Sequence, residues 1–308
     1  MSYDSIFRPD LFAGQVHVVT GGGSGIGRCT AHELASLGAA VVLVGRKAER
    51  LAAVCAEIAD DGGTAIAMPC DIRDESAVRD MVTATLARTG RIDGLVNNAG
   101  GQFAAPLASI SQKGWETVVR TNLTGGFLCA RECFTQWMVD HGGAIVNIVA
   151  DMWGSMPGMG HSGAARWGMV SFTETAAVEW ASSGVRVNAV APGWIASSGL
   201  DTYPDWMQHF LQLLGLAVPL QRLGTESEVS AAIVFLLSPA AAFVSGSVLR
   251  VDGAAPNAKL ASPLSALLPE ATAAAAEGRQ PWPLPPHARS QPWHGFHRAP
   301  LPKRLRPI

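Results

Sequence analysis

One short segment in the middle of the chain groups three side chains that can stabilise charge or move a proton. His161 and Ser162 are adjacent, and Arg166 follows four residues after Ser162. An imidazole can exchange a proton near neutral pH, and a hydroxyl can donate a hydrogen bond to a developing anion. A guanidinium supplies a fixed charge but relays no proton, because it stays charged. Ser162 is too weak an acid to protonate an alkoxide unaided.

A glycine-rich loop near the N-terminus can bind phosphate. It follows a predicted strand and opens a predicted helix, and it reads TGGGSGIG from Thr20. Glycines allow the tight turn and let backbone N–H groups approach a pyrophosphate at the positive end of the helix. The alternative is a tight turn without a ligand. The residues expected to bind the cofactor here are Gly21, Gly23, Ser24, Gly25, Ile26 and Gly27.

The elements that position these groups are short apolar strands that alternate with amphipathic helices. The predicted strands are Val16–Thr20, Ala40–Gly45, Thr64–Pro69, Gly94–Asn97, Ala144–Val149, Val185–Ala191 and Ser247–Val251. Helices are expected at Gly25–Leu37, Lys47–Asp61, Asp74–Arg88, Leu107–Val139 and Ser162–Ala181. This alternation predicts a parallel sheet covered on both faces, with ligands at the carboxyl ends of its strands. We therefore expect one α/β domain over residues 1–253, with a Rossmann-type, doubly wound, seven-stranded sheet.

Residues 254–308 have a different composition and form a Pro-rich C-terminal extension. Eleven of the 19 prolines lie there, and the segment carries a formal charge of +5 against −7 for the rest of the chain. Short helices are expected at Ser262–Leu268 and Glu270–Glu277, and the remainder is either a disordered tail or a segment docked over its own or a neighbouring subunit. The aromatic residues that would anchor such docking are Trp282, Trp293 and Phe296.

Composition excludes several other classes of protein. The body is acidic and has no basic stripe, which argues against a nucleic-acid partner. No apolar run is long enough for a membrane span, and the five cysteines form no ligand cluster, so no metal is expected. We expect a cytoplasmic protein with reduced cysteines.

Four ordered motifs resemble the short-chain dehydrogenase/reductase family over about residues 10–255. They are the TGxxxGxG loop, the NNAG motif of residues 97–100, Asn122 in the RTNL motif, and Pro192-Gly193 after the sixth strand. The resemblance implies the Rossmann-type fold and a nicotinamide cofactor. It further implies that the cofactor contacts Asp71, Ile72, Asn98, Ala99, Gly100, Arg166, Pro192, Gly193 and Ile195.

The end of the second strand indicates which cofactor is used. An acidic residue there would accept the ribose 2′-OH and repel a 2′-phosphate, but the strand is followed by Arg46 and Lys47. These cations favour NADP(H) over NAD(H). Alternatively, they begin a solvated helix face, with Arg46 stacked on the adenine.

The expected catalytic residues differ from the family pattern. The family uses a Tyr and a Lys four residues apart, but this chain has only Tyr3 and Tyr203, and neither is followed by Lys at that spacing. Alignment places Ser162 at the Tyr position and Arg166 at the Lys position. The family's Ser position falls at Val149 or Ala150, next to Asp151.

This variant pattern resembles peroxisomal trans-2-enoyl-CoA reductases, dienoyl-CoA reductases and bacterial citronellol/citronellal dehydrogenases. Reduction of a conjugated double bond suits the residues best, because an enolate oxygen needs hydrogen-bond donors rather than a strong acid. Candidate donors are Asn122, His161 and Ser162, and Asp151 is a proton source if burial raises its pKa. Otherwise His161 starts a helix and faces solvent, and Asp151 is a loop or capping residue.

Two other functions stay open. Alcohol/aldehyde interconversion on an acyclic terpenoid would use His161 or Asp151 for proton transfer, and an NADP(H)-binding pseudoenzyme would transfer no hydride. An apolar small molecule or an acyl-CoA is the expected substrate, and a homotetramer is implied by the resemblance. The residues expected to frame an apolar substrate are Met152, Trp153, Met156, Met159, Trp194 and the segment Tyr203–Leu216.

Overall fold

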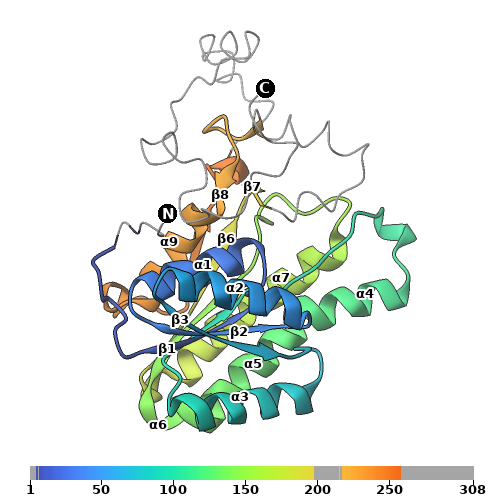
Figure 1. Ribbon diagram of the computed structural model, residues 1–308. Coiled ribbons are helices and arrows are strands. Elements are labelled where there is room, and N and C mark those ends of the chain that lie inside the picture. Colours follow the sequence, from blue (N-terminus) through green and yellow to red (C-terminus); the bar gives the residue numbers. More distant parts are fainter. Residues whose placement is uncertain (1–4, 6, 198–214, 216, 258–308) are drawn as a thin grey trace.

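The computed structural model describes residues 5, 7–197, 215 and 217–257. Seven parallel strands form one sheet in the order β3-β2-β1-β4-β5-β6-β9 (Figure 1). Their bounds are β1 Val16–Thr20, β2 Ala40–Gly45, β3 Thr64–Pro69, β4 Gly94–Asn97, β5 Gly143–Ile148, β6 Val185–Pro192 and β9 Val248–Val251. The strand order reverses between β1 and β4, which is the point where such sheets bind a nucleotide.

Helices cover both faces of this sheet, as the near-continuous apolar strands predict. One hydrophobic core lies under α1 (Gly25–Ser36), α2 (Ala48–Asp60) and α9 (Glu226–Leu237). The other lies under α3 (Glu75–Thr89), α5 (Gly125–Cys133) and α7 (Gly160–Glu179). Figure 1 shows a small second sheet, β7 (Ile195–Ala196) paired with β8 (Gly224–Thr225), beyond the carboxyl ends of the main strands.

The predicted fold class is confirmed, and the strand bounds agree to within one residue. The expected single helix Leu107–Val139 is wrong in detail. A 3₁₀ turn, Leu107–Ser109, is separate from α4 (Gln112–Val119). From α4 the chain then continues through wider π-helical turns at Arg120–Thr124 and Phe134–Met138, which flank α5 and lead into α6 (Val139–His141). Such single π-helical turns are frequent at functional sites.

Several expectations fall on residues outside the described part of the chain. These are Tyr3, most of the segment Tyr203–Leu216, and the helices and aromatic anchors expected after residue 257. Among the described residues, no helix combines the length and the apolar character that crossing a membrane requires.

Candidate active site

The glycine-rich loop joins β1 to α1 and has the conformation expected of a phosphate-binding turn. Gly21 and Gly25 have φ values of +68° and +59°, which side chains rarely adopt. A β-carbon on Gly21 would lie 2.7 Å from Nδ2 of Asn98, and one on Gly27 would lie 2.4 Å from the carbonyl oxygen of Gly21. The glycines therefore form a cradle that any side chain would fill, beside the N-terminus of α1.

Thr20 and Asn98 lock the ends of β1 and β4 together at the switch point. The Thr20 hydroxyl accepts hydrogen bonds from the backbone N–H groups of Asn98 and Ala99, each at 3.0 Å. In return, Nδ2 of Asn98 donates to the Thr20 carbonyl at 2.9 Å. Thr20 was not predicted as a site residue, although its position at the end of β1 is the signal that identifies it.

A cavity of about 310 Å³ runs along this switch point. Most of the expected cofactor-binding residues line it, but Lys47 does not and is instead the exposed N-cap of α2. Arg73 is an unexpected member. The residues that line the cavity are Gly21, Ser24, Gly25, Ile26, Gly45, Arg46, Cys70, Asp71, Ile72, Arg73, Asn98, Ala99, Gly100, Thr121 and Ser197.

The far end of this cavity is charged. The Arg73 guanidinium donates to both carboxylate oxygens of Asp71, with Nε–Oδ1 at 2.9 Å and Nη2–Oδ2 at 2.5 Å. These bonds lower the pKa of Asp71 to about 2. Arg46 adds a second cation on the same rim. The glycine cradle, the paired Asp71 and the cations fit a dinucleotide, with a place for an additional phosphate.

Arg166 lies on α7 and reaches back to the sheet. Its Nη1 donates to the Ile148 carbonyl at the end of β5, at 2.6 Å. A β-carbon on Gly100 would lie 2.5 Å from its Nη2, so the guanidinium is pressed against the loop that lines the cofactor cavity. Burial lowers the pKa of Arg166 to about 10, which keeps it charged at neutral pH. It therefore supplies fixed positive charge under the cofactor site.

Asn122 holds the loop after β4. It lies in the first π-helical turn, almost fully buried, and its amide pairs with Gly101 in both directions. Nδ2 donates to the Gly101 carbonyl and Oδ1 accepts from the Gly101 N–H, each at 2.9 Å. Asn122 therefore fixes the position of this loop, and its amide is already engaged.

Ser162 and His161 are both completely buried at the start of α7. The Ser162 hydroxyl donates to Oε1 of Gln102 at 2.7 Å, a partner that was not predicted. Nδ1 of His161 accepts from the backbone N–H of Ser162 at 2.9 Å, which leaves the proton of the neutral ring on Nε2. No hydrogen-bond partner for Nε2 lies within the described residues. The alternative in which His161 faces solvent is wrong, because Phe103 packs edge-on against its ring.

The positions where the family carries its Ser have no polar side chain to offer. Val149 is buried and extends the backbone pairing of β5 with Val190, and Ala150 follows it. Asp151 comes next and is only half-buried. Burial, and then the negative charge of Asp252, raises the pKa of Asp151. The condition for Asp151 to serve as a proton source is therefore met.

A second cavity, of about 500 Å³, adjoins Asp151 and fits a small ligand. Met156, Met159 and Trp194 line it as expected. Met152 does not, because it belongs to the core, and Trp153 turns outward to a surface shared with Trp167. The residues that line the cavity are Gln102, Ala150, Asp151, Gly154, Ser155, Met156, Pro157, Met159, Pro192, Gly193, Trp194, Ala217, Ala255 and Pro256.

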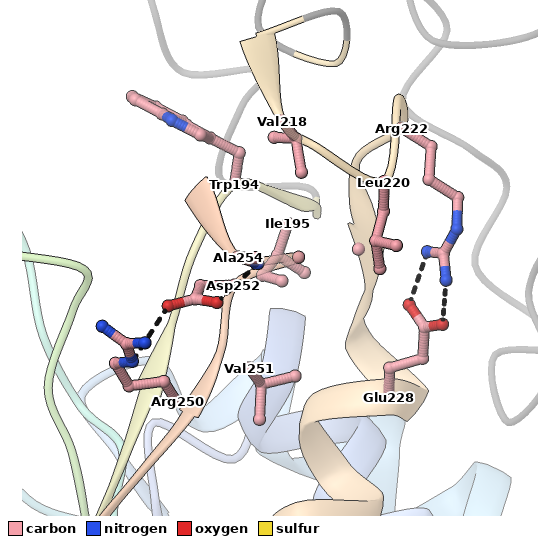
Figure 2. Close-up of a pocket in the computed structure, with 12 residues that line it drawn as sticks. Trp194, Ile195, Val218, Leu220, Arg222, Glu228, Arg250, Val251, Asp252 and Ala254 are labelled. Carbon is pink, nitrogen blue, oxygen red and sulfur yellow. Dashed lines mark hydrogen bonds and ion pairs between the residues drawn. The ribbon is translucent and has the colours of Figure 1, made fainter. Parts of the chain in front are cut away.

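A third cavity lies on the other side of Trp194 and is shown in Figure 2. Its apolar wall is formed by Ile195, Val218 and Leu220. Arg222 and Glu228 face each other across two hydrogen bonds, of 2.9 and 2.6 Å, so this pair is electrically neutral. The cavity supports the loop that carries Trp194 and Ile195, rather than offering free charges to a ligand.

Comparisons with known proteins agree with this geometry. The family model described as Enoyl-(Acyl carrier protein) reductase matches residues 21–254. A peroxisomal 2,4-dienoyl-CoA reductase of Danio rerio is 37% identical over 257 residues, which are 82% of this chain and 85% of the relative. A solved citronellol catabolism dehydrogenase (AtuB) of Pseudomonas aeruginosa PAO1 is 65% identical with a TM-score of 0.75, and the match covers 82% of this chain and 100% of that one. The structure of an actinorhodin polyketide ketoreductase with NADPH is 30% identical with a TM-score of 0.77, over 82% and 100% of the two chains.

The switch-point cavity and the parallel sheet define a dinucleotide-binding oxidoreductase. The chain belongs to the short-chain dehydrogenase/reductase family and is an NAD(P)(H)-dependent enzyme of that family. The pseudoenzyme alternative gains no support, because these relatives are named as enzymes.

Proposed function

We propose that this enzyme reduces the conjugated double bond of an apolar enoyl-thioester substrate. The observation that carries the proposal is the pairing of Ser162 with Gln102 at the position where the family has its acid. A serine hydroxyl held by an amide does not protonate an alkoxide, whereas it can take part in binding an enolate oxygen. The chemistry at this site therefore fits charge stabilisation better than carbonyl protonation.

Of the three candidate donors, His161 is the one left for the substrate. The amide of Asn122 is paired with Gly101, and the Ser162 hydroxyl with Gln102. The Nε2–H of His161 is buried without a partner among the described residues, and leaving a buried donor unpaired costs roughly 1–3 kcal/mol. A thioester oxygen that gains negative charge would satisfy it, so we assign His161 to hold that oxygen.

The remaining steps follow from the cofactor cavity. Bound NADPH supplies the hydride for the β-carbon. The glycine cradle and Arg166 hold the cofactor at the switch point, and Pro192 and Gly193 border both the sheet end and the substrate cavity. Arg46 and Arg73 on the adenosine rim, and the lack of an acid at the end of β2, support NADP(H) over NAD(H).

A second candidate, alcohol/aldehyde interconversion on an acyclic terpenoid, is favoured by one observation. The residues that line the substrate cavity include no Lys or Arg, and neither does the stretch 198–216. A coenzyme A thioester carries phosphates that cations usually bind, whereas a terpenoid alcohol needs none. The AtuB relative, whose title names citronellol catabolism, fits this candidate.

The test is NADPH oxidation with a medium-chain trans-2-enoyl-CoA and, in parallel, with citronellal. We expect turnover of the thioester, with deuterium from labelled NADPH at the β-carbon of the saturated product. The His161→Phe variant, which can keep the edge contact with Phe103, should lose about 10²-fold in kcat. The control is His141→Gln, which removes an exposed imidazole at the end of α6. Turnover of citronellal alone would reject the proposal and support the second candidate.

Assembly and location are further parts of the proposal. The helical run from α4 to α6 and the 20-residue helix α7 are long enough to pair with a second copy, which supports a homotetramer. The reduced cysteines, of which Cys29, Cys70, Cys129 and Cys133 are buried, support a cytoplasmic location.

A further inference from the structure

Two carboxylates flank the Pro192-Gly193 turn at the carboxyl end of the sheet. Asp151 follows β5, Asp252 follows β9, and β6 lies between these two strands. The backbone N–H of Asp151 donates to the Pro192 carbonyl at 3.0 Å. On the other side, a β-carbon on Gly193 would lie only 2.7 Å from Cα of Asp252. Both acids are therefore fixed against the same turn, next to the substrate cavity.

Asp252 is a buried carboxylate whose hydrogen bonding is incomplete. Its side chain is 7% exposed, and Oδ1 accepts from the Ala254 N–H at 2.8 Å (Figure 2). Oδ2 accepts no hydrogen bond from the described residues, although Nε of Arg250 is 3.5 Å away. A buried carboxylate oxygen without a donor is unfavourable, so this geometry points to a proton shared with a neighbouring acid.

Arg250 does not fully neutralise Asp252, because its guanidinium is shared among three partners. It lies 5.4 Å from the centroid of the Trp153 ring, and its Nη2 donates to Oδ1 of Asn257 at 3.1 Å. Asp252 and Arg250 are the charged groups that act on Asp151. The neighbouring turn after β6 and the loop after β4 contribute Pro192, Gly193, Trp194 and Gln102 to the cavity wall, and none of these ionises.

We propose that Asp151 and Asp252 form a carboxyl pair that retains one proton, and that Asp151 delivers this proton to the α-carbon of the substrate. The proposal rests on the double-bond reduction inferred above. Hydride addition at the β-carbon moves the π electrons into an enolate, and the enolate α-carbon then forms a C–H bond with the Asp151 proton. Asp151 is left as a carboxylate and regains its proton from water. Asp252 acts through Asp151 and is a positioning residue.

The pair can be tested without any substrate. Infrared difference spectra between wild type and Asp151→Asn should show a protonated carboxyl that persists above the pH range in which an ordinary aspartate ionises. In Asp252→Asn, that carboxyl should ionise at lower pH, because the neighbouring negative charge is gone. In Arg250→Met it should ionise at higher pH, because the cation is gone. A midpoint that moves in neither variant would overturn the pair.

Kinetics then test the role of the proton. With a trans-2-enoyl-CoA, Asp151→Asn should lower kcat about tenfold or more with little change in KM, consistent with the loss of a general acid. The alkaline limb of the kcat profile should move to lower pH in Asp252→Asn and to higher pH in Arg250→Met, with KM unchanged. The matched control is Asp140→Asn, an exposed aspartate on α6.

The two proposals fail separately. If wild type reduces no enoyl thioester, the proposed function is wrong, while the infrared titration still decides whether the carboxyl pair exists. If wild type is active and Asp151→Asn keeps full kcat, the proton comes from elsewhere and the assignment of Asp151 is wrong. If Asp252→Asn does not fold, Arg250→Met supplies the opposite shift and decides the same question.

Discussion

Nη2 of Arg166 lies so close to Gly100 that a β-carbon on Gly100 would come within 2.5 Å of it. This contact joins α7 to the loop after β4, and it lies directly beneath the cofactor cavity. The same guanidinium is held by the Ile148 carbonyl at 2.6 Å. Glycine at position 100 is therefore what lets a buried arginine occupy this place.

Gly100→Ala should weaken cofactor binding more than it destabilises the fold. The long Arg166 side chain can move away, but it then loses its hydrogen bond to Ile148, and a charged hydrogen bond contributes roughly 1.5–3 kcal/mol. We expect at least an approximately tenfold rise in the Kd of NADPH, measured by fluorescence titration. The matched control is Gly101→Ala, because a β-carbon on Gly101 meets nothing within 4 Å.

A double-mutant cycle separates this effect from a direct clash with the cofactor. If Gly100→Ala acts through the guanidinium, it should add little to the loss already caused by Arg166→Met. Additive losses would show instead that the new methyl group blocks the cavity itself.

Cofactor selection should depend on Arg46 and not on Lys47. Arg46 lines the cavity at its adenosine end, whereas Lys47 points away as the exposed N-cap of α2. Arg46→Ala should raise KM for NADPH about tenfold, the equivalent of one charged hydrogen bond, and should change KM for NADH much less. Lys47→Ala serves as the control. Equal losses with both cofactors in Arg46→Ala would mean that this arginine stacks on the adenine rather than binding a phosphate.

The strands and the cofactor loop could be predicted from the sequence because their signals are local. Each buried strand is a short apolar run, and the glycine-rich loop carries its chemistry within eight residues. The π-helical turns at Arg120–Thr124 and Phe134–Met138 could not, because each widens the helix within an ordinary helical pattern. One of these turns carries Asn122, whose engagement with Gly101 was therefore not foreseen.

The contacts that define the catalytic side of the site join residues far apart in the sequence. Ser162 meets Gln102 across 60 positions, and Phe103 buries the ring of His161. Asp151 and Asp252 come together because β6 places Gly193 between them. No periodicity reports such pairings, so the residue types were predictable, whereas their partners required the structure.

The Ser162 hydroxyl should contribute to double-bond reduction through its fixed position. We expect Ser162→Ala to lower kcat with a trans-2-enoyl-CoA by about tenfold, less than His161→Phe, because the hydroxyl is already bonded to Gln102. KM for the thioester should stay within a factor of about two, since uniform binding is unchanged. Steady-state kinetics of both variants with the same thioester provide the comparison. A larger loss in Ser162→Ala than in His161→Phe would make Ser162 the principal donor.

The buried His17 on β1 should make the fold sensitive to mild acid. Burial lowers its pKa from 6.5 to about 4, an effect that the charge of Asp93 opposes in part. Between these values the unfolded chain binds a proton that the folded protein excludes, so the free energy of unfolding should be full above pH 6.5 and should fall as the pH drops towards 4. The loss attributable to His17 is roughly 3 kcal/mol.

Urea unfolding at intervals between pH 7 and pH 4 measures this loss. His17→Gln should flatten the slope without abolishing it, because burial also lowers the pKa of His32. Asp71 acts in a separate window. Its pKa is lowered from 3.8 to about 2, so its contribution is present above pH 3.8 and is lost only as the pH falls through 2. An unchanged slope between pH 6.5 and 4 in His17→Gln would show that His17 is protonated in the folded protein, which requires water to reach the end of β1.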